Sequence, residues 1–427
     1  MKHRRFAVIL LLIGALLLAS CQVDYIEKTG ETERMAKVAD APTVNTVSQS
    51  PETIFVFTNL SHMRETIPAV DGAIVMLSGY YQAGDGGKGM FYWDSSETAA
   101  DNGGTVIAPT GTEVGRYVRV CESNTVNVKW FGAQGDGSHD DTAAIQAAID
   151  SLPNEGGTVV LPGGRYKVTD TLHIGNGTAD KASDKNGICL VGQGAAFGHE
   201  VTDETTLVAS AKYDTMLSIN GPITDVTIKG IRLNGLANVN TLLYMTDIVQ
   251  CELSYVSGIN FMGTGVIYTA QAPEFGGSHD NIIRSVNFVN VHENTTVFSL
   301  GGNYEKGALV YDTVFEDSRF EPHTFPNCVT LDIRYAEGLT FKRCHISAYS
   351  EESTSLWLNA LENDGYPRQN SFYDCTVASP RVLEDETHII GYHFFLGHGT
   401  YDLELPFADN EHVFGLTDIG SIIRYDG

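Results

Sequence analysis

A strand-like segment recurs along this chain from residue 226 onward, and the repeat constrains the fold more than any other feature. Six such segments run from V-T-I-K-G-I-R-L-N-G (226–235) to S-F-Y-D-C-T-V-A-S-P (371–380). Repeats of this length, without long amphipathic helices, indicate a solenoid in which each repeat packs only on its neighbours. Aligned on one apolar position, the segments are 28, 27, 32, 26 and 31 residues apart, with the anchors Leu233, Phe261, Phe288, Phe320, Ile346 and Val377.

The alignment also predicts which side chains point inward, because successive residues of a strand face opposite sides. The residues two before the anchors are apolar or small, as a filled solenoid interior requires: Ile231, Ile259, Val286, Ser318, Cys344 and Cys375. The residues one before the anchors then point outward: Arg232, Asn260, Asn287, Arg319, His345 and Thr376.

Charged residues gather on the outer positions of the later repeats. Three residues before the anchors the chain carries Gly230, Gly258, Ser285, Asp317, Arg343 and Asp374, and Glu321 follows the anchor Phe320. Neighbouring strands of a sheet lie about 4.8 Å apart. We therefore expect one cluster on a single outer face, made of Asp317, Arg319, Glu321, Arg343, His345 and Asp374.

Three interpretations of this cluster stay open. In a lyase, an arginine neutralises a substrate carboxylate while His345 or an arginine removes the adjacent proton. In a glycoside hydrolase, two carboxylates among Asp317, Glu321 and Asp374 act as acid and base. Alternatively, the residues form cross-strand ion pairs on a solvated sheet. We take Asp317, Arg319, Arg343, His345 and Asp374 as candidate catalytic residues.

The loop 357–366 supplies further candidates for substrate binding. Trp357 and Tyr366 are aromatic residues of the kind that stack on sugar rings, and Glu362 is a carboxylate that binds hydroxyl groups. With Glu321 they form the predicted binding set, although a plain surface loop explains the same residues. No cysteine or histidine spacing predicts a metal site.

A helix followed by a strand precedes the repeats. The glycines of W-F-G-A-Q-G-D-G-S-H-D-D-T (130–142) allow tight turns, and Asp140 and Asp141 are suited to the start of a helix. From Thr142 the run A-A-I-Q-A-A-I-D has helical spacing, and 158–161 is a short β-branched strand. These elements are suited to capping one end of a stack of strands.

This stretch, 130–166, resembles the opening motif of the pectate-lyase-like superfamily. The resemblance implies an all-β fold, a right-handed parallel β-helix over 126–427 with an N-terminal capping helix. It also implies action on glycans along an outer groove. The ordered carboxylate, His-Gly and Arg-x-Lys motifs of polygalacturonase-like hydrolases are missing, and so is the calcium-binding series of pectate lyases. We therefore expect no cofactor, while Ca²⁺ stays an open alternative.

A small β-rich module is predicted over 51–125. Short strand-like runs separated by glycines include G-Y-Y-Q-A-G-D-G-G-K-G-M-F-Y-W-D (79–94), and they are similar to the module that precedes the β-helix in tailspike-like proteins. Its aromatic residues are expected to form a core, with a sugar-stacking platform as the alternative. The likeness to tailspikes leaves a homotrimer open.

The first residues resemble a bacterial lipoprotein signal. Basic residues precede the apolar run 6–19, which is short for a membrane span, and L-A-S-C (18–21) is similar to a lipobox. The resemblance implies a signal peptide over 1–20, lipidation of Cys21 and a tether over 21–50. The protein is then expected in the bacterial cell envelope, bound to a membrane and facing the periplasm or the exterior.

The strong negative charge narrows the choice of partners. The chain carries 53 Asp and Glu against 27 Lys and Arg, a formal net charge of −26. Such a field disfavours nucleic acid as a partner. We expect an envelope-anchored protein that binds and cleaves polysaccharide as a lyase or glycoside hydrolase. The alternative is a non-catalytic glycan-binding or surface-structural β-helix.

Overall fold

The computed structural model describes residues 54–121, 124–177, 185–195, 204–350, 352–359, 370–378, 394–395 and 423–426. Every described residue belongs to one compact unit, residues 52–427.

A small module opens the described chain, as predicted. Its sheet A has the order β1-β2-β3-β5-β4, from the elements β1 (Phe55–Phe57), α2 (Leu60–Arg64), β2 (Ile74–Leu77), β3 (Gly89–Asp94), β4 (Val106–Ile107) and β5 (Arg116–Arg119). Strand β3 alternates strictly. Phe91 and Trp93 are buried in the module core, whereas Tyr92 is 38% exposed. The aromatic cluster is therefore divided between core and surface.

The predicted cap follows. It consists of η1 (Val128–Phe131) and α3 (Thr142–Asp150), and α3 buries Ile145, Ala148 and Ile149 as its spacing predicts. The Asp140 carboxylate accepts a hydrogen bond from the backbone N–H of Thr142. Asp141 does not cap the helix with its side chain. Its carboxylate instead accepts the N–H groups of Gln134 and Gly135, which ties down the preceding turn.

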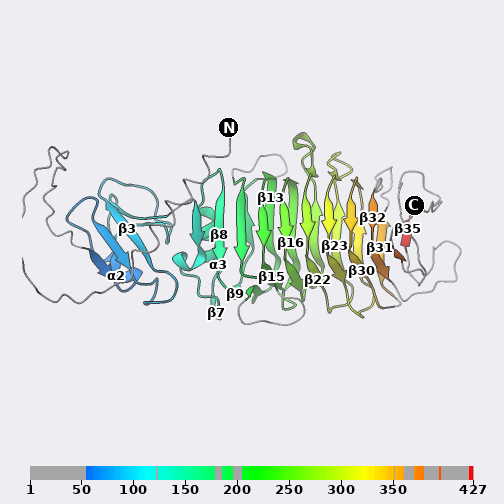
Figure 1. Cartoon of the computed structure of the whole chain (residues 1–427), viewed down its shortest axis with the longest axis horizontal. Coiled ribbons are helices and arrows are strands. Elements are labelled where there is room, and N and C mark those ends of the chain that lie inside the picture. The colour runs from blue at the N-terminus through cyan, green and yellow to red at the C-terminus, as the bar shows by residue number, and fades with distance from the viewer. Residues whose placement is uncertain are drawn as a thin grey trace, which may run out of the picture. The chain divides into compact units, whose positions relative to one another are not determined.

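Three parallel sheets build the β-helix (Figure 1), and each turn contributes one strand or strand pair to each sheet. Sheet B contains β6 (Thr125–Asn127), β8 (Gly157–Leu161), β11 (Ile188–Gly192), β14 (Thr227–Lys229), β17 (Glu252–Ser254), β21 (Ile282–Arg284), β25 (Val314–Glu316), β29 (Thr340–Lys342) and β32 (Ser371–Tyr373). Sheet C contains β7 (Asp136–Asp140), β9 (Gly164–Val168), β12 (Thr205–Ala209), β15 (Ile231–Asn234), β18 (Ser257–Ile259), β22 (Asn287–Val289), β26 (Arg319–Glu321), β30 (His345–Ser347), β33 (Thr376–Ala378) and β34 (Phe394–Phe395), the last of which pairs antiparallel. Sheet D contains β10 (Leu172–Ile174), β13 (Tyr213–Thr224), β16 (Val239–Val249), β19 (Thr264–Thr269), β20 (Ser278–His279), β23 (Thr296–Gly301), β24 (Val310–Tyr311), β27 (Val329–Ile333), β28 (Ala336–Glu337), β31 (Thr354–Asn359) and β35 (Ile423–Asp426).

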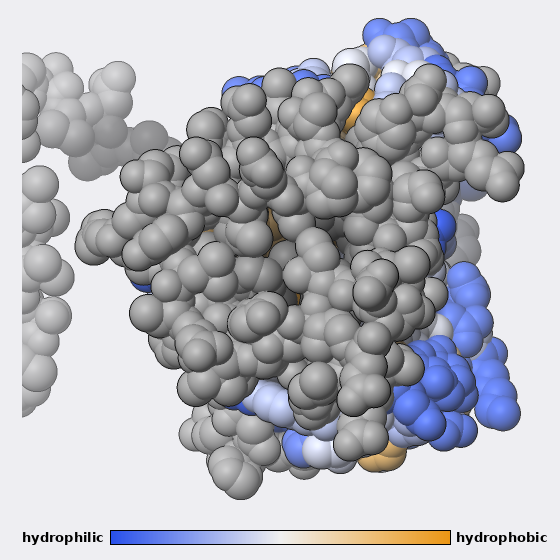
Figure 2. All heavy atoms as spheres, turned by 90° about the vertical axis from the view of Figure 1, so that its right-hand side faces the viewer, coloured by the Kyte–Doolittle hydropathy of each residue, from blue (hydrophilic) through white to orange (hydrophobic). Residues whose placement is uncertain are grey.

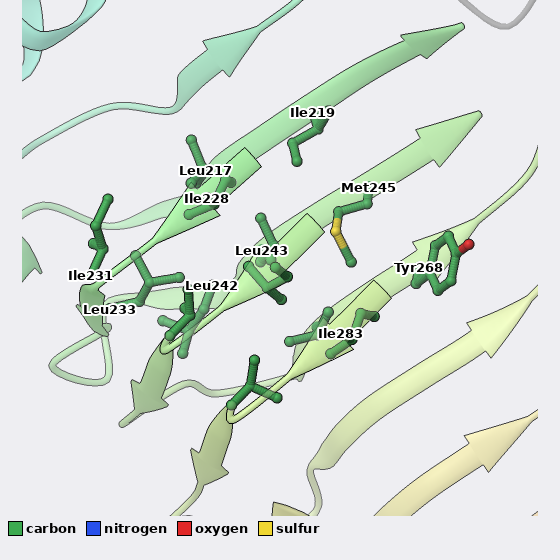
Figure 3. Close-up of a cluster of buried hydrophobic side chains, with 14 of the residues drawn as sticks. Leu217, Ile219, Ile228, Ile231, Leu233, Leu242, Leu243, Met245, Tyr268 and Ile283 are labelled. Atoms are coloured by element: carbon green, nitrogen blue, oxygen red, sulfur yellow. The ribbon is translucent and has the colours of Figure 1, made fainter. Parts of the chain in front are cut away.

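The interior is filled by side chains stacked from turn to turn. Figure 3 shows Ile228 of sheet B, Leu233 of sheet C and Leu243 of sheet D among the buried side chains of one such cluster. In the later turns of sheet B the column becomes aromatic. Phe341 stacks on Phe315 at 4.5 Å and on Phe372 at 4.7 Å between ring centroids. Parallel in-register pairing brings like residues together and builds this apolar core.

The register differs from the predicted alignment at one turn. Leu233 pairs with Gly258, and Gly258 pairs with Phe288, so Gly258 takes the anchor position that the sequence repeat assigns to Phe261. A Cβ atom at Gly258 would lie 2.3 Å from the Phe288 ring, so the ring occupies the space of the missing side chain. Phe261 is buried from another position. The outward residue of this turn is therefore Ser257 rather than Asn260.

Figure 2 looks onto the end of the molecule that carries the last strands. The described residues visible around its rim are mainly hydrophilic, with a few hydrophobic ones among them.

Candidate functional site

The outer face of sheet C carries a grid of side chains, two from each strand from β15 to β30. In register, one column contains Arg232, Ser257, Asn287, Arg319 and His345. The second column contains Asn234, Ile259, Val289, Glu321 and Ser347. Of the six residues predicted to cluster, the structure places Arg319, Glu321 and His345 on this face.

A cleft of about 280 Å³ lies on this face, over strands β15 to β26. Arg232, Ser257 and Asn287 line it from the first column, and Ile259 and Val289 from the second. Arg319, Glu321 and His323 line it at β26 and the turn that follows. The cleft thus combines charged groups with an apolar part of its floor, which is typical of small-molecule and sugar sites.

Arg319 and Glu321 form an ion pair within the cleft. Arg319 Nε lies 2.7 Å from Glu321 Oε2, and its Nη2 contacts the same oxygen. The Glu321 side chain is only 4% exposed, whereas that of Arg319 is 41% exposed. The arginine therefore keeps N–H groups open to the cleft while it compensates a buried carboxylate.

His345 extends the grid on the next turn, where it pairs in register with Arg319. Its Nε2 lies 2.9 Å from Ser347 Oγ and 3.2 Å from Tyr349 Oη. Tyr349 is 42% exposed. A histidine held between two hydroxyl groups and next to an arginine is suited to moving a proton beside a bound anion.

Asp317, Arg343 and Asp374 lie elsewhere, at the corner between sheets B and C. All three have left-handed backbone conformations, with φ of 51°, 52° and 52°. The expectation that they share the outer face is wrong, because side chains stop alternating where the strand turns. Arg343 instead holds Asp317 in a two-armed ion pair, with Nε–Oδ1 at 2.6 Å and Nη2–Oδ2 at 2.9 Å.

The ion pair with Arg343 affects the protonation state of Asp317. The hydrogen bonds from Arg343 hold the pKa of the Asp317 carboxyl below its ordinary value. The Asp317 carboxylate in turn raises the pKa of the Arg343 guanidinium. Asp317 thus stays ionised and is poorly suited to act as a general acid.

Of the three residues that the sequence predicted in the binding loop 357–366, the structure describes only Trp357. Trp357 lies in strand β31 of sheet D, where it pairs with Asp332, so it is part of a strand on another sheet and not of a loop beside the cleft. Glu362 and Tyr366 lie outside the described residues, and so does Cys21. Their predicted roles stay predictions.

Sequence reasoning missed two polar residues of the cleft floor. Ser257 Oγ and Asn287 Oδ1 are buried and have no hydrogen-bond partner within the described part of the chain. The alignment placed Asn287 in the outward column, but only charged residues of that column were taken as candidates. Ser257 was missed because the alignment on Phe261 put Asn260 in its place.

The described residues contain no group of three or more His, Cys, Asp or Glu side chains placed to hold a metal ion. Nor is any helix among them long and apolar enough to cross a membrane.

Two family models match consecutive parts of the chain. Residues 56–122 match the small four-stranded β-sheet domain of phage tail proteins. Residues 125–242 match the rhamnogalacturonase A/epimerase, pectate lyase-like family. The boundary between the two matches falls close to the predicted end of the small module.

Several curated relatives are similar over limited stretches. Mannuronan C5-epimerase AlgE3 of Azotobacter vinelandii is 42% identical over 107 residues, which are 24% of this chain and 6% of that protein. The capsule K30/K69-specific depolymerase 1 of Klebsiella phage K5-2 is 30% identical over 179 residues, 40% of this chain and 21% of that protein. The chain therefore spans less than a quarter of these relatives.

Solved structures share the fold over most of the chain. The tailspike gp49 of Acinetobacter baumannii bacteriophage Fri1, a capsular polysaccharide depolymerase, has a TM-score of 0.59 at 15% identity, covering 77% of this chain and 60% of that one. The biofilm-modifying enzyme WceF of Pantoea stewartii has a TM-score of 0.52 at 16% identity, covering 86% and 52%. The parallel sheets and these structural likenesses show a tailspike-like parallel β-helix fold, and with the family model matched over 125–242 they identify a pectate-lyase-like β-helix protein.

Proposed function

We propose that this protein binds a polysaccharide in the cleft of sheet C and cleaves it by elimination beside a uronate carboxylate. The observation that carries the proposal is the cleft itself, because it holds an accessible arginine and buried polar groups. His345 lies next to that arginine on the following turn of the same sheet, outside the residues that line the cleft. Relatives named as an epimerase, an alginate lyase and a capsule depolymerase support a polysaccharide substrate.

The elimination assigns one role to each of two groups. The open N–H groups of Arg319 bind the uronate carboxylate and stabilise the charge that develops when the adjacent carbon loses its proton. His345 takes that proton. The electron pair of the broken C–H bond then forms a carbon–carbon double bond, and the glycosidic oxygen on the next carbon leaves with its sugar, keeps the electrons of the broken C–O bond and takes up a proton from water. The products are an unsaturated uronate and a new chain end.

Hydrolysis by two carboxylates has weaker support. Asp317 is engaged by Arg343 at the corner, and its lowered pKa works against the protonated state that a general acid needs. Asp374 lies in the same corner column. Glu321 is the remaining carboxylate of the predicted pairs, and it is bound by Arg319.

A non-catalytic glycan-binding protein is the second candidate. It is favoured by the ion pairing of both arginines, since Arg319 contacts Glu321 and Arg343 contacts Asp317. In that case the cleft holds a sugar without changing it.

A digestion assay separates these functions. The purified protein is incubated with a panel of bacterial and algal polysaccharides, and reducing ends and the ultraviolet absorbance of unsaturated uronate are followed together. We expect both signals to rise, and to fall at least about a hundredfold in His345→Ala, the usual contribution of a proton-transferring side chain. Asp374→Ala, at the corner, is the matched control and keeps its activity.

Each outcome of the assay has one meaning. Reducing ends without absorbance indicate a hydrolase. Neither signal on a polysaccharide that the protein binds establishes the non-catalytic function. Loss of activity in Asp374→Ala but not in His345→Ala would place the catalytic residues at the corner between sheets B and C.

We also propose that Cys21 carries the lipid that anchors the protein in the cell envelope, as the lipobox-like L-A-S-C (18–21) suggests. Cells fed a labelled fatty acid should incorporate the label into the natural chain and not into Cys21→Ser. A labelled Cys21→Ser protein excludes the anchor at this residue.

The likeness to tailspikes further supports a homotrimer in solution, which sedimentation analysis tests directly.

A further inference from the structure

Two polar atoms on the cleft floor are buried without a partner. Ser257 and Asn287 pair in register on β18 and β22, and they are 6% and 7% exposed. Neither Ser257 Oγ nor Asn287 Oδ1 has a hydrogen-bond partner within the described part of the chain. Buried hydroxyl and amide oxygens that lack partners cost free energy, so an unexplained pair in a cleft indicates a ligand group that completes them.

Aliphatic side chains stand directly beside these atoms. Ile259 and Val289 are the second outward residues of the same two strands, and both line the cleft. Val291 lines it where the chain leaves β22. A solvated outer sheet face normally carries polar residues at such positions. The middle of the cleft is therefore a small neutral area, with one acceptor, one hydroxyl and an apolar wall.

Ion pairs enclose this neutral area on both sides. Arg232 and Glu204 lie 3.4 Å apart on the side of β15, with side chains only 8% and 5% exposed. Arg319 and Glu321 lie on the side of β26. The two buried carboxylates are thus compensated by protein cations. The charge needed to hold an anionic group is at the edge of the cleft, at Arg319, and not over Ser257 and Asn287.

We propose that this neutral area binds the acetamido group of an N-acetylated amino sugar in the polysaccharide. The N–H of the acetamido group donates to Asn287 Oδ1, its carbonyl oxygen accepts from the Ser257 hydroxyl, and its methyl group packs on Ile259 and Val289. This inference rests on the proposed function and specifies its substrate: the cleaved polymer carries an N-acetylated sugar beside the residue whose carboxylate meets Arg319.

Other sugar substituents fit the same atoms less well. A carboxylate placed there would face the Asn287 oxygen, which repels it. A plain hydroxyl group can donate to Asn287 Oδ1 and accept from the Ser257 hydroxyl, but it leaves the aliphatic wall without a contact. Only a group that combines a donor, an acceptor and a methyl in a short planar unit satisfies both polar atoms and also covers the aliphatic wall.

The test compares two neutral oligosaccharides that differ only in this substituent. Chitin tetrasaccharide has an acetamido group on each sugar, and cellotetraose has a hydroxyl group in its place on the same linkage. Their affinities for the full chain are measured by titration calorimetry. Saturation-transfer NMR then identifies the ligand protons in contact with the protein. We expect chitin tetrasaccharide to bind about fourfold more tightly, the effect of burying one methyl group on the aliphatic wall, with the acetyl methyl protons saturated most strongly.

Two variants place the effect in the cleft. Asn287→Leu keeps the side-chain volume and removes the acceptor, so the preference for chitin tetrasaccharide should fall to near unity. Asn240→Leu, at an exposed position of β16 in sheet D, is the matched control and keeps the preference. If Asn287→Leu does not fold, Ser257→Ala removes the hydroxyl partner with a smaller change.

The inference is overturned by equal affinities for the two tetrasaccharides, by failure of both to bind, or by a preference that survives in Asn287→Leu. None of these results bears on the digestion assay, which scores cleavage on a separate panel. A protein that cleaves a polymer of uronates alone and shows no acetamido preference keeps the proposed function and loses this inference.

Discussion

At the scale of single residues, burial separates two ion pairs that look alike in sequence. Arg319–Glu321 holds a carboxylate that is almost fully buried, whereas in Arg343–Asp317 both side chains are about half exposed. A buried charge that loses its partner is costly, while an exposed one is rehydrated by water. Arg319 therefore contributes more to the free energy of unfolding than Arg343 does, although each arginine contacts one carboxylate.

Arg319→Ala is expected to lower the free energy of unfolding by about 2 kcal/mol, because Glu321 stays buried without its cation. Arg343→Ala is the matched control and changes stability little, because water replaces the lost partner of Asp317. Urea unfolding followed by circular dichroism measures both. Equal losses in the two variants would contradict the assignment of Glu321 as the buried carboxylate.

At the scale of elements, one left-handed residue turns the chain from sheet B to sheet C in successive turns. The corner positions are Gly230, Tyr255, Ser285, Asp317, Arg343 and Asp374, with φ between 51° and 68°. Backbone N–H groups at these corners bond to the next turn, as from Ser285 to the carbonyl of Glu316. The corners thus tolerate side chains of many kinds, at a backbone cost that glycine avoids.

Two substitutions at these corners should act in different ways. Ser285→Gly removes the left-handed strain but also raises the conformational entropy of the unfolded chain. The two effects oppose each other, so the free energy of unfolding changes by less than about 1 kcal/mol. Gly230→Ala should lower stability by about 2 kcal/mol. At that glycine the φ is 68°, and a Cβ atom would lie 2.8 Å from the carbonyl oxygen of Gly192. Thermal and urea unfolding provide the comparison, and a larger loss in Ser285→Gly would be inconsistent with this account of the corners.

At the scale of the whole molecule, acidity makes stability depend on pH. Backbone N–H groups of His139 and Ser138 lower the pKa of Asp136 from 3.8 to about 2. The pKa of Asp85 is also lowered: burial acts to raise it, but four backbone N–H groups outweigh burial. Asp141 is the opposite case, since burial raises its pKa above the ordinary value.

Stability should therefore decrease as the pH falls from about 4 to about 2. A carboxyl group with a lowered folded-state pKa stabilises the fold above its unfolded-state pKa, and this contribution is lost as the pH falls through the folded-state value. Urea midpoints measured at several pH values test this, and Asp85→Asn should flatten the profile. A midpoint that stays constant over this range argues against these carboxylates as stabilising groups.

The sequence by itself predicted a solenoid of strands, its capping helix, the small module and most of the inward column, because each of these depends on local alternation and turn chemistry that recur at a readable spacing. Arg319, Glu321 and His345 were placed correctly on one face for the same reason, since they lie within strands. That the solenoid is a parallel β-helix was implied by the resemblance of 130–166 to the pectate-lyase-like superfamily.

Only the tertiary structure decided the rest of the site. Asp317, Arg343 and Asp374 lie at a left-handed corner between sheets B and C, where the alternation of a strand no longer applies. The anchor at Gly258 depends on the ring of Phe288 from the next turn filling its space, a packing relation between residues 30 positions apart that no single segment encodes. Whether a polar side chain such as Asn287 is satisfied depends on everything packed around it, so the unpartnered atoms of the cleft became visible only in the folded chain.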